Sequence, residues 1–120
     1  MLNVDTNVLL YAMTGALKPV EAALLSANRW SISAIVLWEM GKLAQKGRIS
    51  VDLEDPEVVR TLAQIHVWPI TRQIAHMSTR LDIRSDPADE LIAATSIVHN
   101  VPLLTRDRAL SKSKLTPLAR

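Results

Sequence analysis

The sequence of 120 residues contains no cysteine. It therefore has no disulfide bond, no zinc site with thiolate ligands and no iron–sulfur cluster. This absence fits a reducing compartment, and we expect the protein to lie in the cytoplasm. Aromatic residues are also scarce, with no phenylalanine, one tyrosine and three tryptophans. The chain therefore has few aromatic side chains from which to build a surface that stacks on single-stranded bases.

Long apolar segments and glycine-rich loops are missing as well. No apolar run in the sequence approaches the roughly 20 residues of a membrane-spanning helix. The N-terminus lacks the basic region and apolar core of a signal peptide, so we expect neither membrane insertion nor export. With only three glycines, the chain has no glycine-rich phosphate loop. An enzyme that uses nucleoside triphosphates is therefore disfavoured.

The composition is that of one small globular domain, which we place at residues 1–120. Hydrophobic residues make up 48% and charged residues 22% of the chain, which is ordinary at this length. The net charge is +2, but residues 106–120 carry five basic side chains and one acid, whereas residues 1–105 carry nine basic and eleven acidic ones. A basic segment beside an acidic centre would attract a polyanion, although taken alone it is more simply a solvated terminus.

Short apolar runs alternate with helical patterns along the chain. The predicted strands are residues 2–5, 30–33, 67–70 and 101–105, with 115–118 as a candidate for a last one. The predicted helices are residues 6–13, 19–27, 34–46, 56–65, a helix from 71 to about 81, 87–99 and a short one after 107. This alternation indicates an α/β fold with a small parallel central sheet covered on both faces, in which Pro69 suggests an edge strand.

Four acids stand next to apolar segments. Asp5 ends the first predicted strand and Asp107 follows the last long one, so both lie at the carboxyl edge of the sheet, where such folds bind ligands. Glu39 lies at the edge of the apolar face of its helix, and Asp89 lies in the first turn of another. Carboxylates beside buried segments are costly unless a positive charge offsets them. Mg²⁺ or Mn²⁺ supplies that charge, prefers carboxylate oxygen and suits phosphodiester hydrolysis.

Each acid also has a simpler structural explanation. Asp5 and Asp107 can cap the helices that follow them, and Asp89 lies three residues after the helix cap expected at Asp86. Glu39 can pair with a lysine three residues on. For Asp86 the capping role is the better explanation, whereas the sequence alone leaves both interpretations open for the others.

Four arginines are candidates for contacts to an RNA backbone. Arg106 and Arg108 flank the last acid within the basic segment. Arg72 and Arg80 form one stripe with His76 on the helix after residue 71, at a spacing of four residues. A solvated helix face is the commoner explanation of such a stripe. The three histidines share no ligand spacing, so we do not expect them to bind metal.

The order of these features is more specific than any one of them. The segments that carry it are Val4-Asp5-Thr6-Asn7, Ile35-Val36-Leu37-Trp38-Glu39, Asp86-Pro87-Ala88-Asp89 and Leu103-Leu104-Thr105-Arg106-Asp107. Together they resemble the PIN domain, and most closely the VapC-like ribonuclease toxins of type II toxin–antitoxin modules. The resemblance spans essentially the whole chain and implies a three-layer α/β/α sandwich.

The resemblance also implies a metal-dependent endoribonuclease. Carried over residue by residue, the family's catalytic, metal-binding acids fall on Asp5, Glu39, Asp89 and Asp107, with Mg²⁺ or Mn²⁺ as the cofactor. The helper hydroxyl of the family falls on Thr105, and Asp86 and Asn7 are expected around the acids. One departure is Glu90, which stands where many relatives have arginine and adds negative charge near the site.

The resemblance further implies particular partners. It implies a toxin that cleaves cellular RNA, forms a homodimer and is bound by a cognate antitoxin protein, which inserts a segment into the active-site groove. None of these partners follows from composition or spacing.

Two alternatives stay open at this point. One is a catalytically silent PIN-like module that binds RNA or protein, in which the acids are caps and solvated charges. The other is a phosphorylation-receiver domain, which has a similar length and an acidic Mg²⁺ pocket. It would need a phosphoacceptor aspartate at the end of a middle strand, whereas Asp52 and Asp55 lie in a polar loop.

Overall fold

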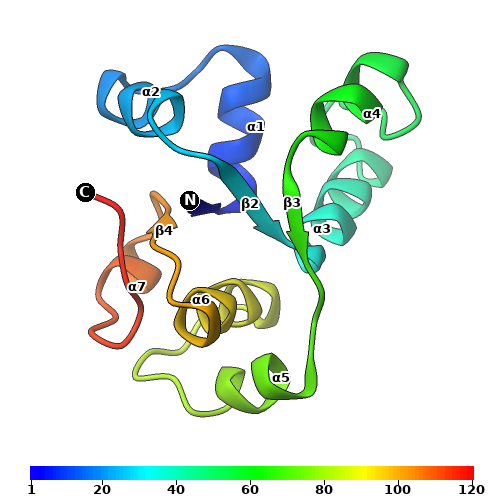
Figure 1. The fold of residues 1–120 in the computed structure, drawn as a ribbon. Helices are drawn as coiled ribbons and strands as arrows, with labels where there is room; N and C mark the ends of the chain where they lie inside the picture. The colour runs from blue at the N-terminus through cyan, green and yellow to red at the C-terminus, as the bar shows by residue number, and fades with distance from the viewer.

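The computed structural model describes residues 1–120 and contains one four-stranded sheet with helices around it (Figure 1). The strands are β1 (Leu2–Val4), β2 (Trp30–Ser33), β3 (His66–Trp68) and β4 (Leu103–Leu104). Their order is β3-β2-β1-β4, and every neighbouring pair is parallel. The predicted parallel sheet is confirmed, and β3 lies at an edge, as Pro69 suggests.

Seven helices connect and cover the strands. They are α1 (Thr6–Thr14), α2 (Pro19–Ser26), α3 (Ala34–Gln45), α4 (Pro56–Ala63), α5 (Arg72–Ser78), α6 (Pro87–His99) and α7 (Arg108–Ser111). The connections through α1–α2 and α3–α4 cross the sheet in one direction, and the connection through α5–α6 crosses back. Because such crossovers are right-handed, they place α5 and α6 on the opposite face from α1–α4. Figure 1 shows α5 and α6 together, apart from α1, α2 and α4, so the expected three-layer sandwich is confirmed.

Residues that favour helix ends fix most of these boundaries. Pro19, Pro56 and Pro87 each begin a helix, where the missing N–H costs nothing. Gly15 (φ 74°) and Asn100 (φ 52°) end α1 and α6 in the left-handed conformation that these residue types tolerate. As a result α6 has the predicted bounds, and most other boundaries lie within two residues of the prediction.

Three predicted boundaries are wrong. The fifth helix ends at Ser78, so Arg80 and Leu81 lie beyond it. The last long strand is only Leu103–Leu104, and the Val101 N–H donates instead to the Ser96 carbonyl at the end of α6, at 3.0 Å. The candidate strand at 115–118 is reduced to a single bridge between residues 103 and 118.

The core lies between the sheet and its helices. Val4 and Ile32 on the strands are fully buried together with Val36 of α3 and Ile92 of α6. Residues 92–96 of α6 are buried without interruption, as its apolar sequence predicts. No single helix is long and apolar enough to cross a membrane; α1 and α2 meet that measure only as a pair bent by 95°.

Candidate active site

Asp5 follows the inner strand β1 and is only 4% exposed. Its Oδ1 accepts a 2.8 Å hydrogen bond from the Thr6 N–H and so caps α1. Its Oδ2 accepts a 2.6 Å hydrogen bond from the Thr105 hydroxyl, which comes from the other end of the chain. Burial raises the pKa of Asp5 above its ordinary value, and these two hydrogen bonds oppose the rise. Asp5 can therefore cap α1 and belong to the site at the same time, because its Oδ1 serves the cap and its Oδ2 binds Thr105.

Glu39 faces Asp5 from α3. Its Oε1 accepts a hydrogen bond from the hydroxyl of Thr6, the residue after Asp5. Burial raises the pKa of Glu39, the Thr6 hydrogen bond opposes the rise, and the negative charges of Asp5 and Asp86 add to it. Glu39 therefore belongs to the acidic centre.

The pair between Glu39 and Lys42, one of the two interpretations left open, is absent. The Lys42 ammonium donates instead to Gln45 Oε1 at 3.3 Å and lies 5.9 Å from the centre of the Trp38 ring. Glu39 and these three side chains line an open cavity of about 440 Å³. Glu39 is thus reached from solvent past an indole and an ammonium group.

Asp89 lies in the first turn of α6, where its Oδ2 accepts a 3.0 Å hydrogen bond from the Ser85 hydroxyl. Burial, followed by the negative charge of Asp5, raises the pKa of Asp89 to about 6. The hydrogen bond from Ser85 opposes this rise, and the charges of Glu39 and Asp107 add to it. Because all three other acids act on Asp89, the four carboxylates share one region.

Asp107 begins α7, and its Oδ1 accepts a 3.0 Å hydrogen bond from the Leu110 N–H. Its own N–H donates to Thr105 Oγ1 at 2.9 Å. Since the same hydroxyl donates to Asp5, Thr105 joins the first and last acids of the site. The predicted capping role of Asp107 is confirmed, and it leaves the second carboxylate oxygen available.

The other predicted polar residues lie around this centre. Asp86 occupies the cap position of α6, as predicted, but its side chain makes no capping hydrogen bond. Asn7 is exposed and lines an open cavity with Tyr11. Glu90 accepts a 3.3 Å hydrogen bond from the Ser85 N–H, so the departure at this position closes the loop that carries Ser85.

The four arginines lie in different surroundings. Arg72, Arg80 and Arg108 are exposed, but Arg80 lies beyond the end of α5, so no single helical stripe exists. Arg106 is committed to Glu21 of α2, with which it forms an ion pair at 2.6 Å.

Three residues of the site were not predicted. The hydroxyls of Thr6 and Ser85 hold Glu39 and Asp89, and Glu21 holds Arg106. Thr6 and Ser85 stand inside the motifs around Asp5 and Asp89, so their position was a usable signal. Glu21 carries no such signal, because its partner is 85 residues away.

The donor set has the chemistry that a hard divalent cation needs. Carboxylates and hydroxyls offer only oxygen. Burial, with a further contribution from neighbouring acids, raises the pKa of Asp5, Glu39 and Asp89 and so disfavours their charged forms in the absence of a cation. No three Asp, Glu or His side chains converge closely enough to hold an ion as they stand. The side chains therefore fit a metal by type, and binding would require the carboxylates to approach one another.

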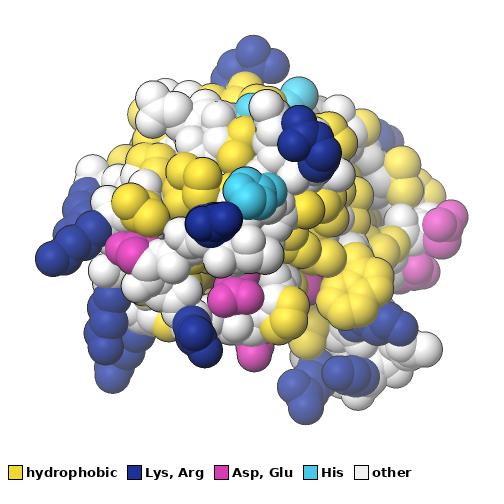
Figure 2. Space-filling view, turned by 90° about the horizontal axis from the view of Figure 1, so that it is seen from below, with side chains coloured by type: hydrophobic (Ala, Val, Ile, Leu, Met, Phe, Trp, Pro, Cys, Tyr) yellow, Lys and Arg dark blue, Asp and Glu magenta, His cyan; other side chains and the backbone are white.

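Figure 2 shows the face below the strand ends of Figure 1, with acidic side chains among hydrophobic ones and several basic side chains around them.

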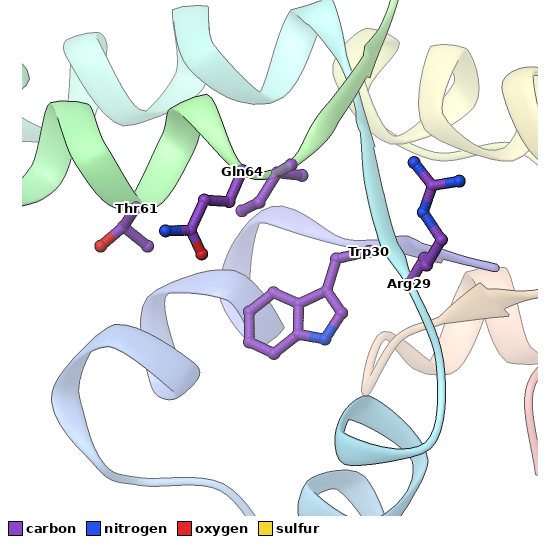
Figure 3. Close-up of a pocket in the computed structure, with 5 residues that line it drawn as sticks. Arg29, Trp30, Thr61 and Gln64 are labelled. Atoms are coloured by element: carbon purple, nitrogen blue, oxygen red, sulfur yellow. The ribbon is translucent and has the colours of Figure 1, made fainter.

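A cavity of about 290 Å³ lies at the other edge of the sheet, where β2 begins (Figure 3). It is lined by Arg29, Trp30, Thr61, Gln64 and Ile65. Because no acid lies there, we assign this cavity no part in the site.

A family model described as PIN domain matches residues 3–114. The chain belongs to the PIN domain family. All four acids of this PIN domain lie within the matched segment, and the resemblance stated from the sequence is confirmed. The phosphorylation-receiver alternative is wrong.

Individual relatives agree with this assignment. The PIN domain is 33% identical over 91 residues to Ribonuclease VapC22 of Mycobacterium tuberculosis, a match that covers 73% of this chain and 70% of the relative. Its fold is similar to that in a toxin-antitoxin complex from Klebsiella pneumoniae, with a TM-score of 0.73, 21% identity and coverage of 93% and 92%. It is also similar to VapBC2 from Rickettsia felis bound to a DNA fragment from their promoter, with a TM-score of 0.76, 19% identity and coverage of 99% and 98%.

Proposed function

We propose that this PIN domain is a metal-dependent endoribonuclease that acts as the toxin of a type II toxin–antitoxin system. The observation that carries the proposal is the group of four carboxylates from β1, α3, α6 and the turn before α7. Burial, and then the negative charges of Asp5, Glu39 and Asp107, raise the pKa of the fourth, Asp89, to about 6. Partly buried carboxylates that share one region are unfavourable in the charged form unless a cation or a proton offsets them.

The names of the similar proteins support the biological part of the proposal. The relative at 33% identity is named a ribonuclease, and the two similar solved structures are described as a toxin-antitoxin complex and a VapBC assembly. We extend these descriptions to this chain: its substrate is RNA, and its protein partner is a cognate antitoxin. Action on cellular RNA places it in the cytoplasm.

The residues that would hold Mg²⁺ or Mn²⁺ are Asp5, Glu39, Asp89 and Asp107. When bound, such an ion lowers the pKa of a water molecule and stabilises charge on a phosphate. Thr105 and Thr6 orient Asp5 and Glu39, and Ser85 orients Asp89, so carboxylates from different elements keep defined positions. Of the four arginines predicted to contact the RNA backbone, Arg108, Arg72 and Arg80 are exposed and available for this role.

A catalytically silent binding module is the second candidate. One observation favours it: no three of the acids converge closely enough to hold an ion as they stand. In that case RNA would bind without cleavage, and replacing the acids would leave RNA binding intact.

Cleavage of a mixed RNA pool by the purified chain tests the proposal, with Mn²⁺, with EDTA and with Asp5→Asn, and with the fragment ends read by sequencing. We expect cleavage at defined sites that is lost with EDTA. Asp5→Asn should lower the rate about a hundredfold or more, since even partners outside the ligand set of a metal contribute about 10- to 100-fold.

Two comparisons complete this experiment. The control variant Glu57→Gln removes an exposed acid on α4, and it should cleave RNA at the same rate as the unsubstituted chain. A single-stranded DNA pool of the same sequences tests whether the substrate is RNA. Cleavage that survives Asp5→Asn would contradict the assigned site, and RNA binding without any cleavage would establish the silent module.

A further inference from the structure

Arg106 lies between two residues of the acidic centre, yet its side chain is engaged on α2. Its Nε donates to Glu21 Oε2 at 2.7 Å and its Nη2 donates to Glu21 Oε1 at 2.6 Å, which is the two-bond fork that only arginine forms. Nη2 also donates to the Ala16 carbonyl at 3.0 Å, and the guanidinium lies 3.9 Å from the centre of the Tyr11 ring. Arg106 thus contacts α1, α2 and the loop between them.

Glu21 is as firmly placed as its partner. The residue is only 7% exposed, and its Oε1 also accepts a 2.8 Å hydrogen bond from the Lys18 N–H at the start of α2. The hydrogen bonds from Arg106 are the main cause that lowers the pKa of Glu21 to about 2. The pair therefore stays ionised at ordinary pH, and removing either partner would leave the other charge without its counterion.

The backbone on both sides of Arg106 carries the site. Thr105 donates its hydroxyl to Asp5 at 2.6 Å and accepts the Asp107 N–H at 2.9 Å. The three residues 105–107 are therefore held from one side by Asp5 and from the other by Glu21. Without the Arg106 side-chain bonds, this turn would keep its hydrogen bonds to Asp5 and to the first turn of α7, but it would lose those to α2 and to the loop before α2.

We propose that Arg106 and Glu21 are positioning residues of the acidic centre, which fix the turn at 105–107 so that Thr105 and Asp107 keep their places beside Asp5. The inference deepens the proposed function and rests on it, because the consequence that matters is the affinity of the centre for a divalent cation. It also gives Arg106 a task other than contact with RNA.

Four variants test this role. Arg106→Gln and Glu21→Gln each remove one side of the fork, while Arg106→Lys keeps the charge and replaces the fork with a single point contact, which favours correct folding. The matched control is Arg60→Gln, which breaks the exposed Glu57–Arg60 pair on α4, the other ion pair of the chain.

The first measurement needs no metal. Hydrogen exchange of the Asp107 amide, followed by NMR in the presence of EDTA, reports whether its bond to Thr105 persists. We expect at least tenfold faster exchange in Arg106→Gln and Glu21→Gln, a smaller increase in Arg106→Lys and none in Arg60→Gln. Unchanged exchange in the first two variants, with the chain folded, would overturn the proposal.

The second measurement is the affinity for Mn²⁺, read from the paramagnetic resonance signal of the free ion. We expect it to fall about tenfold or more in Arg106→Gln and Glu21→Gln, which is the usual effect of removing a residue that supports metal ligands. Unchanged affinity in both variants, beside normal binding by the unsubstituted chain, would overturn the positioning role alone. Absence of Mn²⁺ binding in the unsubstituted chain would instead overturn the proposed function.

Discussion

At the scale of single residues, the acids of this chain are close enough to disturb one another. Asp89 has the clearest signature, because its pKa is raised from 3.8 to about 6. A carboxyl group with a raised pKa in the folded state keeps its proton after the unfolded chain has released it. The free energy of unfolding therefore falls as the pH rises from about 4 to about 6, and the loss is complete above that range.

Asp89→Asn should remove this part of the pH dependence. We expect the melting temperature of the unsubstituted chain, in EDTA, to fall between about pH 4 and about pH 6, the range set by the raised pKa of Asp89. The Asn variant should lose less, although Asp5 and Glu39 retain part of the decline because their pKa values are also raised. Thermal melting followed by circular dichroism at several pH values measures the difference.

A control and an ion complete this test. Glu57→Gln should melt with the same pH dependence as the unsubstituted chain, because Glu57 is an exposed acid on α4. Mn²⁺ should raise the melting temperature of the unsubstituted chain near pH 7 and raise that of Asp89→Asn less, since a ligand that binds only the folded state stabilises it. Parallel curves for Asp89→Asn and the unsubstituted chain would contradict the raised pKa.

The four acids could be selected from the sequence because each stands at a strand end or a helix face that the local pattern reveals. Thr105 was expected beside them, but the hydrogen bonds that hold the acids could not be predicted. Thr6 contacts Glu39 across 33 residues, and Thr105 contacts Asp5 across 100, so these bonds depend on the packing of distant elements. The sequence also presented capping and site membership as alternatives for Asp5. The structure combines them, because a carboxylate has two oxygens to offer.

At the scale of elements, helix ends were predictable where a residue type dictates them. Pro87 and Asn100 enclose α6, and its bounds are the predicted ones. The apolar run at 101–105 did not reveal a strand of only two residues, because β4 pairs with just two positions of β1, Asn3 and Val4. Pairing partners limit strand length, and a single sequence does not show them.

The contact between β1 and α6 contains a buried polar link that should matter for stability. Asn3 is fully buried, and its Nδ2 donates to Ser96 Oγ at 2.9 Å and to the Ile92 carbonyl at 3.2 Å. Asn3→Ala should lower the free energy of unfolding by about 1–3 kcal/mol, since it leaves the Ser96 hydroxyl without this partner. Urea denaturation measures the change.

Two further variants check that the loss comes from this link. Adding Ser96→Ala to Asn3→Ala should cost less than Ser96→Ala alone, because the two side chains act as a pair. Asn7→Ala, at an exposed position, should change the free energy of unfolding by less than about 0.5 kcal/mol. Strictly additive costs for Asn3 and Ser96 would contradict the predicted coupling.

At the scale of the whole molecule, alternating strands and helices were sufficient to predict a parallel sheet in a three-layer sandwich. The strand order β3-β2-β1-β4 was not predicted, because periodicity identifies elements and not their neighbours. The exposure of single side chains was not predicted either: Trp38, next to Glu39, is 56% exposed. A large exposed apolar side chain in this position supports the homodimer that the resemblance to the family implies.

Trp38→Ala should weaken that homodimer. Replacing a tryptophan that anchors an interface by alanine typically reduces the binding free energy by about 2 kcal/mol or more. The dissociation constant of the dimer should therefore rise at least about thirtyfold. Light scattering coupled to size-exclusion chromatography over a range of concentrations measures it. Val20→Ala, at an exposed apolar position on α2, is the matched control. An unsubstituted chain that is monomeric at all concentrations, or an unchanged constant in Trp38→Ala, would contradict this interface.

The pairing of β1 with β4 has a consequence for the chain while it is being synthesised. Strand β1 is made early, but one of its two neighbours, β4, exists only after residues 103–104 have been made. Asp5 can contact Thr105 and Asp107 only after that point. A nascent or truncated chain that stops before this point has at most three of the four carboxylates and an unpaired edge on β1. The complete acidic centre is therefore among the last parts of the fold that translation can deliver.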